Sequence, residues 1–347
     1  MVGEEILPLY NSLPGALQLL MRFIFSEAFV KAVIFPGAIF STLLGLFALW
    51  YERKLLARIM LRVGPLHVGK VSGILQTLAD GLKLLSKERI VPENANKALF
   101  VLMPATVLIL SLLLYAFLPF SPSWIIFPSE IGLLLFFAVS ALTPVPLLVA
   151  GYASGSKYPL IGTTRLALML FGYEIPMFIA LTGVVLMSGS FNLVKIVEAQ
   201  SAVPFIIPQI IGFIVFFTTV LAEAERVPFD IPTAEGEIVS GWGTEYSGAY
   251  FLMIYLALYE KLIALSVLTS LLYLGGWHGP PIPGLPESIY APFWLMIKTF
   301  LVLTVIFMFR AIFPRFTIEK VLDLGWKYLI PLGFLNLFIV ILFVEFL

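Results

Sequence analysis

Cysteine is absent from this chain of 347 residues, and histidine occurs only twice, as His67 and His278. Iron–sulfur clusters are bound by cysteine thiolates, and haem in membrane proteins is usually bound by histidine. The topology derived below places the two histidines in loops on opposite sides of a membrane. We therefore expect this chain to bind no metal and no redox cofactor of its own.

Charged residues are also scarce, at 12% of the chain, whereas hydrophobic residues make up 60% and the mean hydropathy is +1.02. Soluble globular domains carry roughly 25% charged residues. The composition therefore excludes a soluble protein and predicts an integral membrane protein, whose surroundings are the lipid bilayer and whose partners do not include nucleic acid. The sequence shows no soluble domain, no low-complexity tract and no internal repeat.

Long apolar runs are the main feature that the sequence does contain. Each has roughly the 20 residues that a helix needs to cross a bilayer. We expect an all-α polytopic protein, with one membrane domain over residues 1–347 and about eight transmembrane helices. The segment 1–27 is interrupted by Asn11, Pro14 and Arg22, so we predict that it lies at the membrane interface. The predicted spans are residues 28–50, 98–118, 131–150, 166–187, 203–222, 248–274, 291–312 and 326–346.

Lysine and arginine are distributed unevenly among the loops. Most of them lie in the first, third, fifth and seventh loops, whereas the second, fourth and sixth together hold only Lys195. Basic loops stay in the cytoplasm. We therefore predict a multi-pass protein of the cell membrane, with its odd-numbered loops in the cytoplasm and both termini outside.

The longest loop, residues 51–97, begins with basic residues and continues with a helical pattern. Apolar residues recur at helical spacing from Val71 to Leu85, while polar residues occupy the opposite face from Ser72 to Lys87. Such a pattern predicts an amphipathic helix at the cytoplasmic surface, lying on the membrane or under a partner.

The fifth loop, residues 223–247, holds six carboxylates and a single arginine, Arg226, between two apolar spans. Crowded carboxylates at a low-dielectric boundary repel one another and lose hydration, and both effects raise a carboxyl pKa toward neutrality. We therefore interpret this loop as a set of proton carriers with Arg226 as their movable counter-ion. The carboxylates belong to Glu223, Glu225, Asp230, Glu235, Glu237 and Glu245.

Three further ionisable residues, Glu174, Glu260 and Lys261, fall inside predicted spans, and Arg165 lies at the mouth of the fourth span as a second counter-ion. Charges at this depth cost roughly 2.5 to 3.5 kcal/mol each and are candidates for function. Pro176 follows Glu174 by two residues and cannot donate a hydrogen bond to the carbonyl of Gly172. The freed carbonyl beside a carboxylate predicts a place where water or a proton is held.

Several separated blocks of sequence form a pattern in a fixed order. The blocks are Glu52–Pro65, Leu75–Glu88, Gly151–Tyr158, Tyr173–Glu174, Glu223–Asp230, Thr244–Gly248, Leu274–Trp277, Arg310–Phe316 and Leu324–Lys327. Together they resemble the H-subunit (subunit 1) family of respiratory complex I and its membrane-bound hydrogenase relatives. The resemblance extends over residues 50–347.

This resemblance implies a non-catalytic coupling subunit between a peripheral redox arm and an ion-translocating membrane arm. The implied partners are iron–sulfur and hydrogenase-like subunits of the peripheral arm, which carry the clusters, and antiporter-like and small membrane subunits. Carried over by position, four residues would lie on the first-loop helix, against the peripheral arm or in the wall of a quinone chamber: Arg53, Arg62, Asp80 and Lys83. The acids of the fifth loop would form a funnel, with Glu174 deeper along the proton path.

Two alternatives stay open at this point. Quinone-reducing relatives usually carry an acid at the positions of Thr233 and Leu258 and a glutamine at Met169, so the complex is either quinone-reducing or a ferredoxin-dependent hydrogenase or sulfur reductase. The other alternative is a free-standing secondary transporter or channel. Transporters of that kind commonly consist of two related halves, which this sequence does not show.

Overall fold

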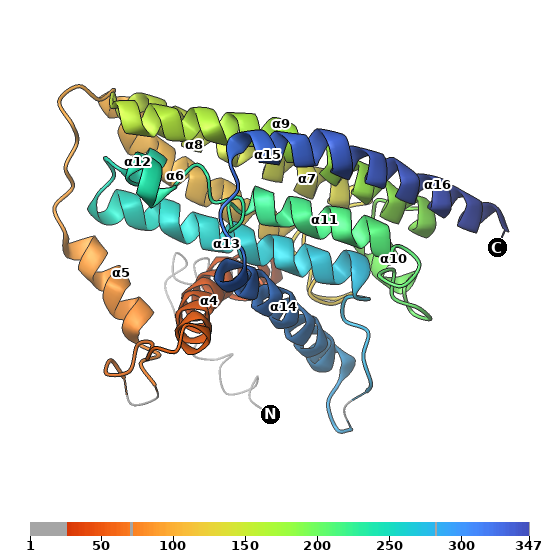
Figure 1. The fold of residues 1–347 in the computed structure, drawn as a ribbon. Coiled ribbons are helices and arrows are strands. Elements are labelled where there is room, and N and C mark those ends of the chain that lie inside the picture. The colour runs from red at the N-terminus through yellow and green to blue at the C-terminus, as the bar shows by residue number, and fades with distance from the viewer. Residues whose placement is uncertain (1–25, 70–71, 282, 347) are drawn as a thin grey trace, which may run out of the picture.

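A computed structural model describes residues 26–69, 72–281 and 283–346, so the predicted interfacial segment 1–27 lies almost entirely outside the described residues. The described part of the chain is helical and contains no strand (Figure 1). The predicted all-α polytopic fold is therefore confirmed.

Seven helical segments among the described residues are long and apolar enough to cross a membrane, and they correspond to seven of the eight predicted spans. They are Glu27–Ile59, Lys97–Ala116, Gly132–Ala153, Lys157–Ser188, Gly248–Tyr273, Glu287–Ile312 and Ile318–Glu345. Their main helices are α4 (Ala38–Ile59), α6 (Lys97–Leu113), α7 (Gly132–Leu142), α8 (Pro144–Ala153), α9 (Lys157–Ser188), α13 (Gly248–Tyr273), α14 (Glu287–Ile312) and α16 (Ile330–Phe346).

The predicted span 203–222 is shorter in the structure, where α11 covers only Ile210–Glu223. Its 14 residues extend about 21 Å, less than the roughly 30 Å of a bilayer core. Pro204 and Pro208 lack the amide protons that a helix continuing toward residue 203 would need. Side chains satisfy the early start: Asn336 of α16 accepts from the Gly212 amide at 3.0 Å, and Gln209 donates to the Gly183 carbonyl.

Prolines and π-turns interrupt other spans. α7 and α8 form one span divided at Thr143, because Pro144 and Pro146 cannot continue the hydrogen bonds of α7. The remaining elements are α3 (Glu27–Phe29), η1 (Val30–Ile34), α5 (Gln76–Ser86), η2 (Leu114–Ala116), α10 (Leu193–Glu198), α12 (Glu235–Ile238), η3 (Gly241–Gly243), α15 (Ile318–Asp323) and η4 (Leu324–Leu329).

α9 runs through Pro176 as one helix, and the carbonyl of Gly172 does not face a water site. It packs against Gly325 of η4, where an added Cβ would lie only 2.0 Å from the Gly172 oxygen. Only glycine fits this contact. The predicted use of that carbonyl beside Glu174 is therefore wrong, because the proline-induced gap is filled by a neighbouring backbone.

The amphipathic helix predicted in the first loop is α5, which begins at Gln76. Contrary to our expectation, Arg53 is not part of it but belongs to the last turns of the transmembrane helix α4. Leu78, Leu82 and Leu85 of α5 are exposed, whereas Thr77 is buried toward the bundle. The apolar stripe therefore faces away from this chain and toward lipid or a partner.

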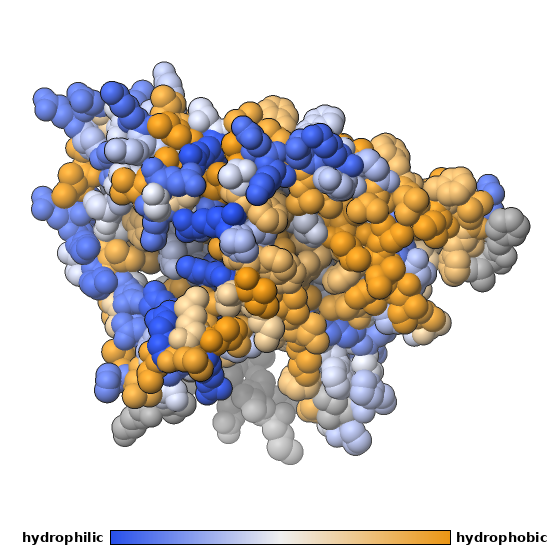
Figure 2. Space-filling model, in the orientation of Figure 1, coloured by the Kyte–Doolittle hydropathy of each residue, from blue (hydrophilic) through white to orange (hydrophobic). Residues whose placement is uncertain are grey.

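α13 is the centre of the bundle and packs against α4, α5, α6 and α14. Every residue from Tyr259 to Tyr273 is buried, which explains why the helix is apolar on all sides. α5 and α12 lie at one end of the bundle, whereas α10 and the loop after α13 lie at the other (Figure 1). Hydrophilic residues gather over the end with α5 and α12, and hydrophobic residues cover the side formed by α11, α14 and α16 (Figure 2).

This arrangement predicts that Ser72, in the first loop, and Ser288, at the start of α14, are reached from opposite sides of the membrane. Both residues are exposed, and the chain has no cysteine that would need to be removed. We expect Ser72→Cys to react with an impermeant thiol reagent only from the cytoplasm and Ser288→Cys only from outside. Labelling of both from one side would overturn the topology.

Candidate functional site

The cytoplasmic half of the bundle contains a buried carboxylate, Glu52, on the inner side of α4. It accepts hydrogen bonds from Arg310 at 2.5 Å and from the Tyr259 hydroxyl at 2.6 Å. Arg226 donates to both carboxylate oxygens, at 3.2 and 3.3 Å. One carboxylate thus joins α4, α13, α14 and the acidic loop.

The guanidinium of Arg226 also lies over the Tyr259 ring, 4.4 Å from its centroid. Our expectation that Arg226 balances the acids of its own loop is therefore corrected, because its ion-pair partner is Glu52. Sequence reasoning missed Glu52, Tyr259 and Arg310 as site residues. Glu52 looked like an ordinary charge at the end of a span, and nothing local in the sequence links it to residues 174 and 258 positions away.

A second ion pair holds the acidic loop from the opposite side. Asp230 accepts a hydrogen bond from Arg315 at 2.9 Å and another from the Thr233 hydroxyl. The Phe316 amide donates to the Pro228 carbonyl at 3.0 Å. The segment after α14 is thereby fixed to the loop, and Arg315 is a further site residue that the sequence analysis did not single out.

Two adjacent cavities open beside these ion pairs and share the aromatic residues Phe251, Tyr255 and Tyr259 of α13. The first, the α4–α5 cavity, has a volume of about 310 Å³ and is lined by Gly45, Leu46, Leu49, Arg53, Thr77, Asp80, Gly81, Lys83, Leu84, Phe251, Leu252, Tyr255, Leu256 and Tyr259. The second, the loop cavity, has about 260 Å³ and is lined mainly by polar residues, including Glu225, Arg226, Asp230, Glu235, Arg310 and Arg315.

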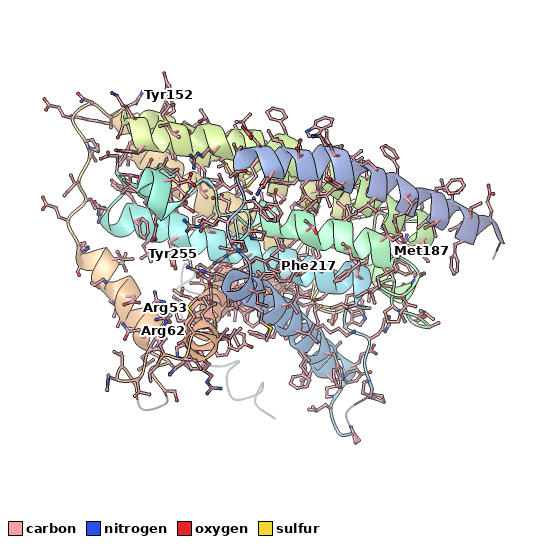
Figure 3. The ribbon with its side chains drawn as sticks, viewed as in Figure 1. Arg53, Arg62, Tyr152, Met187, Phe217 and Tyr255 are labelled. Carbon is pink, nitrogen blue, oxygen red and sulfur yellow. The ribbon has the colours of Figure 1, made fainter. Side chains whose placement is uncertain are left out.

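The predicted docking residues surround the mouth of the α4–α5 cavity only in part (Figure 3). Arg53 donates to Asp80 at 2.5 Å and Gln76 donates to the same carboxylate at 2.9 Å, which fixes α5 to α4. Partial burial alone would raise the pKa of Asp80, but these hydrogen bonds outweigh it and lower the pKa. Lys83 lines the cavity, whereas Arg62 is exposed beyond the end of α4.

Deeper in the bundle, Glu223 and Lys261 form an ion pair of 2.6 Å in which both side chains are at most 3% exposed. Ser140 of α7 donates to the same Glu223 oxygen at 2.8 Å. Glu174 of α9 is half-buried and within electrostatic range of both partners. The structure therefore brings together three of the predicted path residues from α9, α11 and α13.

Glu225 lies between this buried pair and the loop cavity, just after the end of α11. It is 8% exposed, lines the cavity, and has a backbone φ of 51°, in the left-handed region that non-glycine residues rarely adopt. Burial raises the pKa of Glu225 to about 7, and the nearby Lys261 and Trp242 only partly oppose this. Glu225 therefore titrates near neutral pH, next to both the cavity and the buried ion pair.

The other predicted acids do not join one funnel. Glu235 and Glu237 are exposed on α12, and Arg165 pairs with Glu237 at 2.5 Å, away from the buried pair. Glu245 is half-buried before the start of α13. Glu260, although adjacent to Lys261, points to a different side of α13, because neighbouring helical residues are about 100° apart.

Comparison with known proteins agrees with this architecture. The sequence matches the family described as NADH dehydrogenase over residues 31–341. The H subunit of NADH-quinone oxidoreductase from Geobacillus sp. (strain WCH70) is 41% identical over 337 residues, which cover 97% of this chain and 98% of that protein. The corresponding protein of Dehalococcoides mccartyi (strain CBDB1) is 39% identical over 307 residues, covering 88% and 84%. That of Syntrophobacter fumaroxidans, the second of its kind by name, is 40% identical over 306 residues, covering 86% and 90%.

The raised pKa of Glu225 predicts that stability depends on pH. The folded chain holds this proton up to about pH 7, whereas the unfolded chain releases it near the ordinary value of 4.5, so stability falls as pH rises between these values. The loss is on the order of 3 kcal/mol. We expect the thermal midpoint of the wild type to fall from pH 5 to pH 8 by more than that of Glu225→Gln, which has no such proton. Parallel pH profiles for the two proteins would contradict this assignment.

Proposed function

Since this chain belongs to the NADH dehydrogenase family, we propose that it is the membrane component at which a peripheral electron-transferring arm meets an ion-translocating membrane arm. In this role it anchors the arm through its cytoplasmic end, walls the chamber where electrons arrive, and begins the ion path. Its relatives are named as subunits of NADH-quinone oxidoreductase along nearly their full length. This argues against a free-standing transporter or channel.

The two cavities have the chemistry that a quinone requires. A quinone combines an apolar tail with a flat ring bearing two carbonyl oxygens. The α4–α5 cavity offers apolar walls from Leu46, Leu49 and Leu84 and the rings of Phe251 and Tyr255, while Arg53 is a donor at its mouth. We assign the apolar part of a quinone to this cavity, and the polar donors Arg226 and Arg310 to the neighbouring loop cavity.

The observation that carries the proposal is the sequence of acids that leads inward from the loop cavity. Glu225 lines the cavity, Glu223 and Lys261 form the buried pair next to it, and Glu174 lies within their electrostatic range. A unit charge appearing ~10 Å from Glu225 changes its energy by ~1.7 kcal/mol at an effective dielectric constant of 20. That exceeds the 1.36 kcal/mol equivalent to one pKa unit. A change of charge in the cavity is therefore large enough to move a proton at Glu225.

A second candidate is a ferredoxin-dependent hydrogenase or sulfur reductase of the same architecture. It is favoured by Thr233 and Leu258, which line the loop cavity at positions where quinone-reducing relatives usually carry an acid. Both candidates use the same path through Glu225, Glu223 and Lys261, with protons or sodium ions as the transported species. They differ in the electron acceptor.

Docking of the peripheral arm is expected to depend on the Arg53–Asp80 ion pair, because it fixes α5 to the bundle. Asp80→Lys places two cations together and should reduce recovery of the peripheral arm with the membrane arm, without affecting membrane insertion. Exchanging the charges, with Arg53→Asp and Asp80→Arg in one chain, should restore much of the recovery. Full recovery of the intact complex with Asp80→Lys alone would exclude a docking role for this pair.

The ion path is tested with Glu223→Gln and Glu174→Gln in the intact complex in sealed vesicles. Both changes keep the side-chain size and remove the titrating group, so a path role predicts loss of ion pumping in a complex that still assembles with its clusters. Glu130→Gln is a matched control, because Glu130 is an exposed acid paired with Lys195 and lies outside the path. A structural role instead predicts poor assembly, since Lys261 loses its buried partner. Normal pumping in both assembled variants would refute the path.

A further inference from the structure

Glu260 is a fully buried carboxyl group that the path described above does not use. It lies near the middle of α13 and is 0% exposed. Within the described part of the chain, neither of its carboxyl oxygens has a hydrogen-bond partner. The adjacent Lys261 is directed to Glu223 and does not neutralise it.

The groups around this carboxyl are hydroxyls whose protons are used elsewhere. Ser41 donates to the Ala38 carbonyl at 3.1 Å, and Tyr115 donates to the Glu260 backbone carbonyl at 3.1 Å. These two hydroxyls and that of Thr42 surround the carboxyl group with oxygen atoms. Besides Tyr115, no titratable side chain of the described residues on α4, α6 or α14 faces it. Lone pairs facing an uncompensated carboxylate are unfavourable, whereas they can accept a hydrogen bond from a carboxylic acid.

Glu260 also lies directly behind the wall of the α4–α5 cavity. Gly45 and Leu256 line that cavity, and the Glu260 Oε1 atom is 3.4 Å from the position that a Cβ at Gly45 would occupy. Because Gly45 has no side chain, the cavity is separated from the carboxyl group only by the surface of α4. A water molecule or proton acceptor in the cavity can therefore come close to Glu260 without passing Glu223.

We propose that Glu260 is a second proton-holding site of this chain, protonated at rest and exchanging its proton with the α4–α5 cavity past Gly45. The O–H bond of the carboxylic acid is the only bond that breaks, its proton passes to a water or base in the cavity, and it is restored from the same side. The use of this proton for ion translocation rests on the proposed function. Its presence and its route of exchange do not.

Infrared difference spectroscopy on the intact complex tests the presence of the proton. At neutral pH the wild type should show a carbonyl band of a protonated carboxylic acid that is lost in Glu260→Gln and kept in Glu223→Gln. The band should be the same in sodium-containing and sodium-free buffer. A band that is absent, or that appears only when sodium is removed, would overturn the proposal, and the second result would assign a bound sodium ion to Glu260 instead.

The rate at which this band shifts after transfer to D₂O tests the route. Gly45→Ala adds a methyl group in van der Waals contact with the carboxyl, so exchange should slow several-fold. Gly81→Ala is a matched control, because Gly81 lines the same cavity and an added Cβ meets no atom within 4 Å. Exchange that is unaffected by Gly45→Ala but slowed by Glu223→Gln would overturn the separate route. Loss of pumping in Glu223→Gln with normal exchange at Glu260 would leave both proposals intact.

Discussion

The cytoplasmic half of this protein depends on how one buried carboxylate is neutralised. Glu52 is taken out of water by the packing of α4 against α13 and α14, and a carboxylate in such surroundings is stable only when paired and hydrogen-bonded. Arg226, Arg310 and Tyr259 provide this together. In doing so they fix the start of the acidic loop, the centre of α13 and the end of α14 relative to one another. The walls of both cavities are consequences of that arrangement, since each cavity contains residues held by this cluster.

Charge is distributed in the bundle in two ways that have different consequences. Glu52, Asp230 and Asp80 have close cationic partners and therefore hold a fixed negative charge, which suits positioning. Glu225 is buried without a close cation, so its protonation responds to small changes nearby. Acids that look alike in the sequence thus divide into those that hold the structure together and those that can change their charge.

The sequence was sufficient for the membrane class, for the positions of seven long spans, for the amphipathic helix in the first loop and for the relevance of Glu223, Glu174 and Lys261. These predictions depend on apolar length, helical spacing and the cost of charge in lipid, which are local properties. The partners of each charge depend on which helices pack together, so Glu52 could not be linked to Arg226 or Arg310. The reversal of the chain at Glu225 and the filling of the gap at Gly172 by Gly325 are likewise set by tertiary contacts. Only the shortness of α11 had a visible signal, in Pro204 and Pro208.

The wide separation of Glu52 from its partners along the chain has a consequence for how the protein is made. During synthesis the first helix enters the membrane long before Arg226 has been translated, and Arg310 follows only with the α14 span. Until then Glu52 has to remain hydrated at the membrane surface, which its place near the cytoplasmic end of α4 allows. The first helix can therefore reach its final depth and tilt only late in biogenesis. Insertion of this chain ends with a charge-driven closing step in which its earliest and one of its latest helices come together.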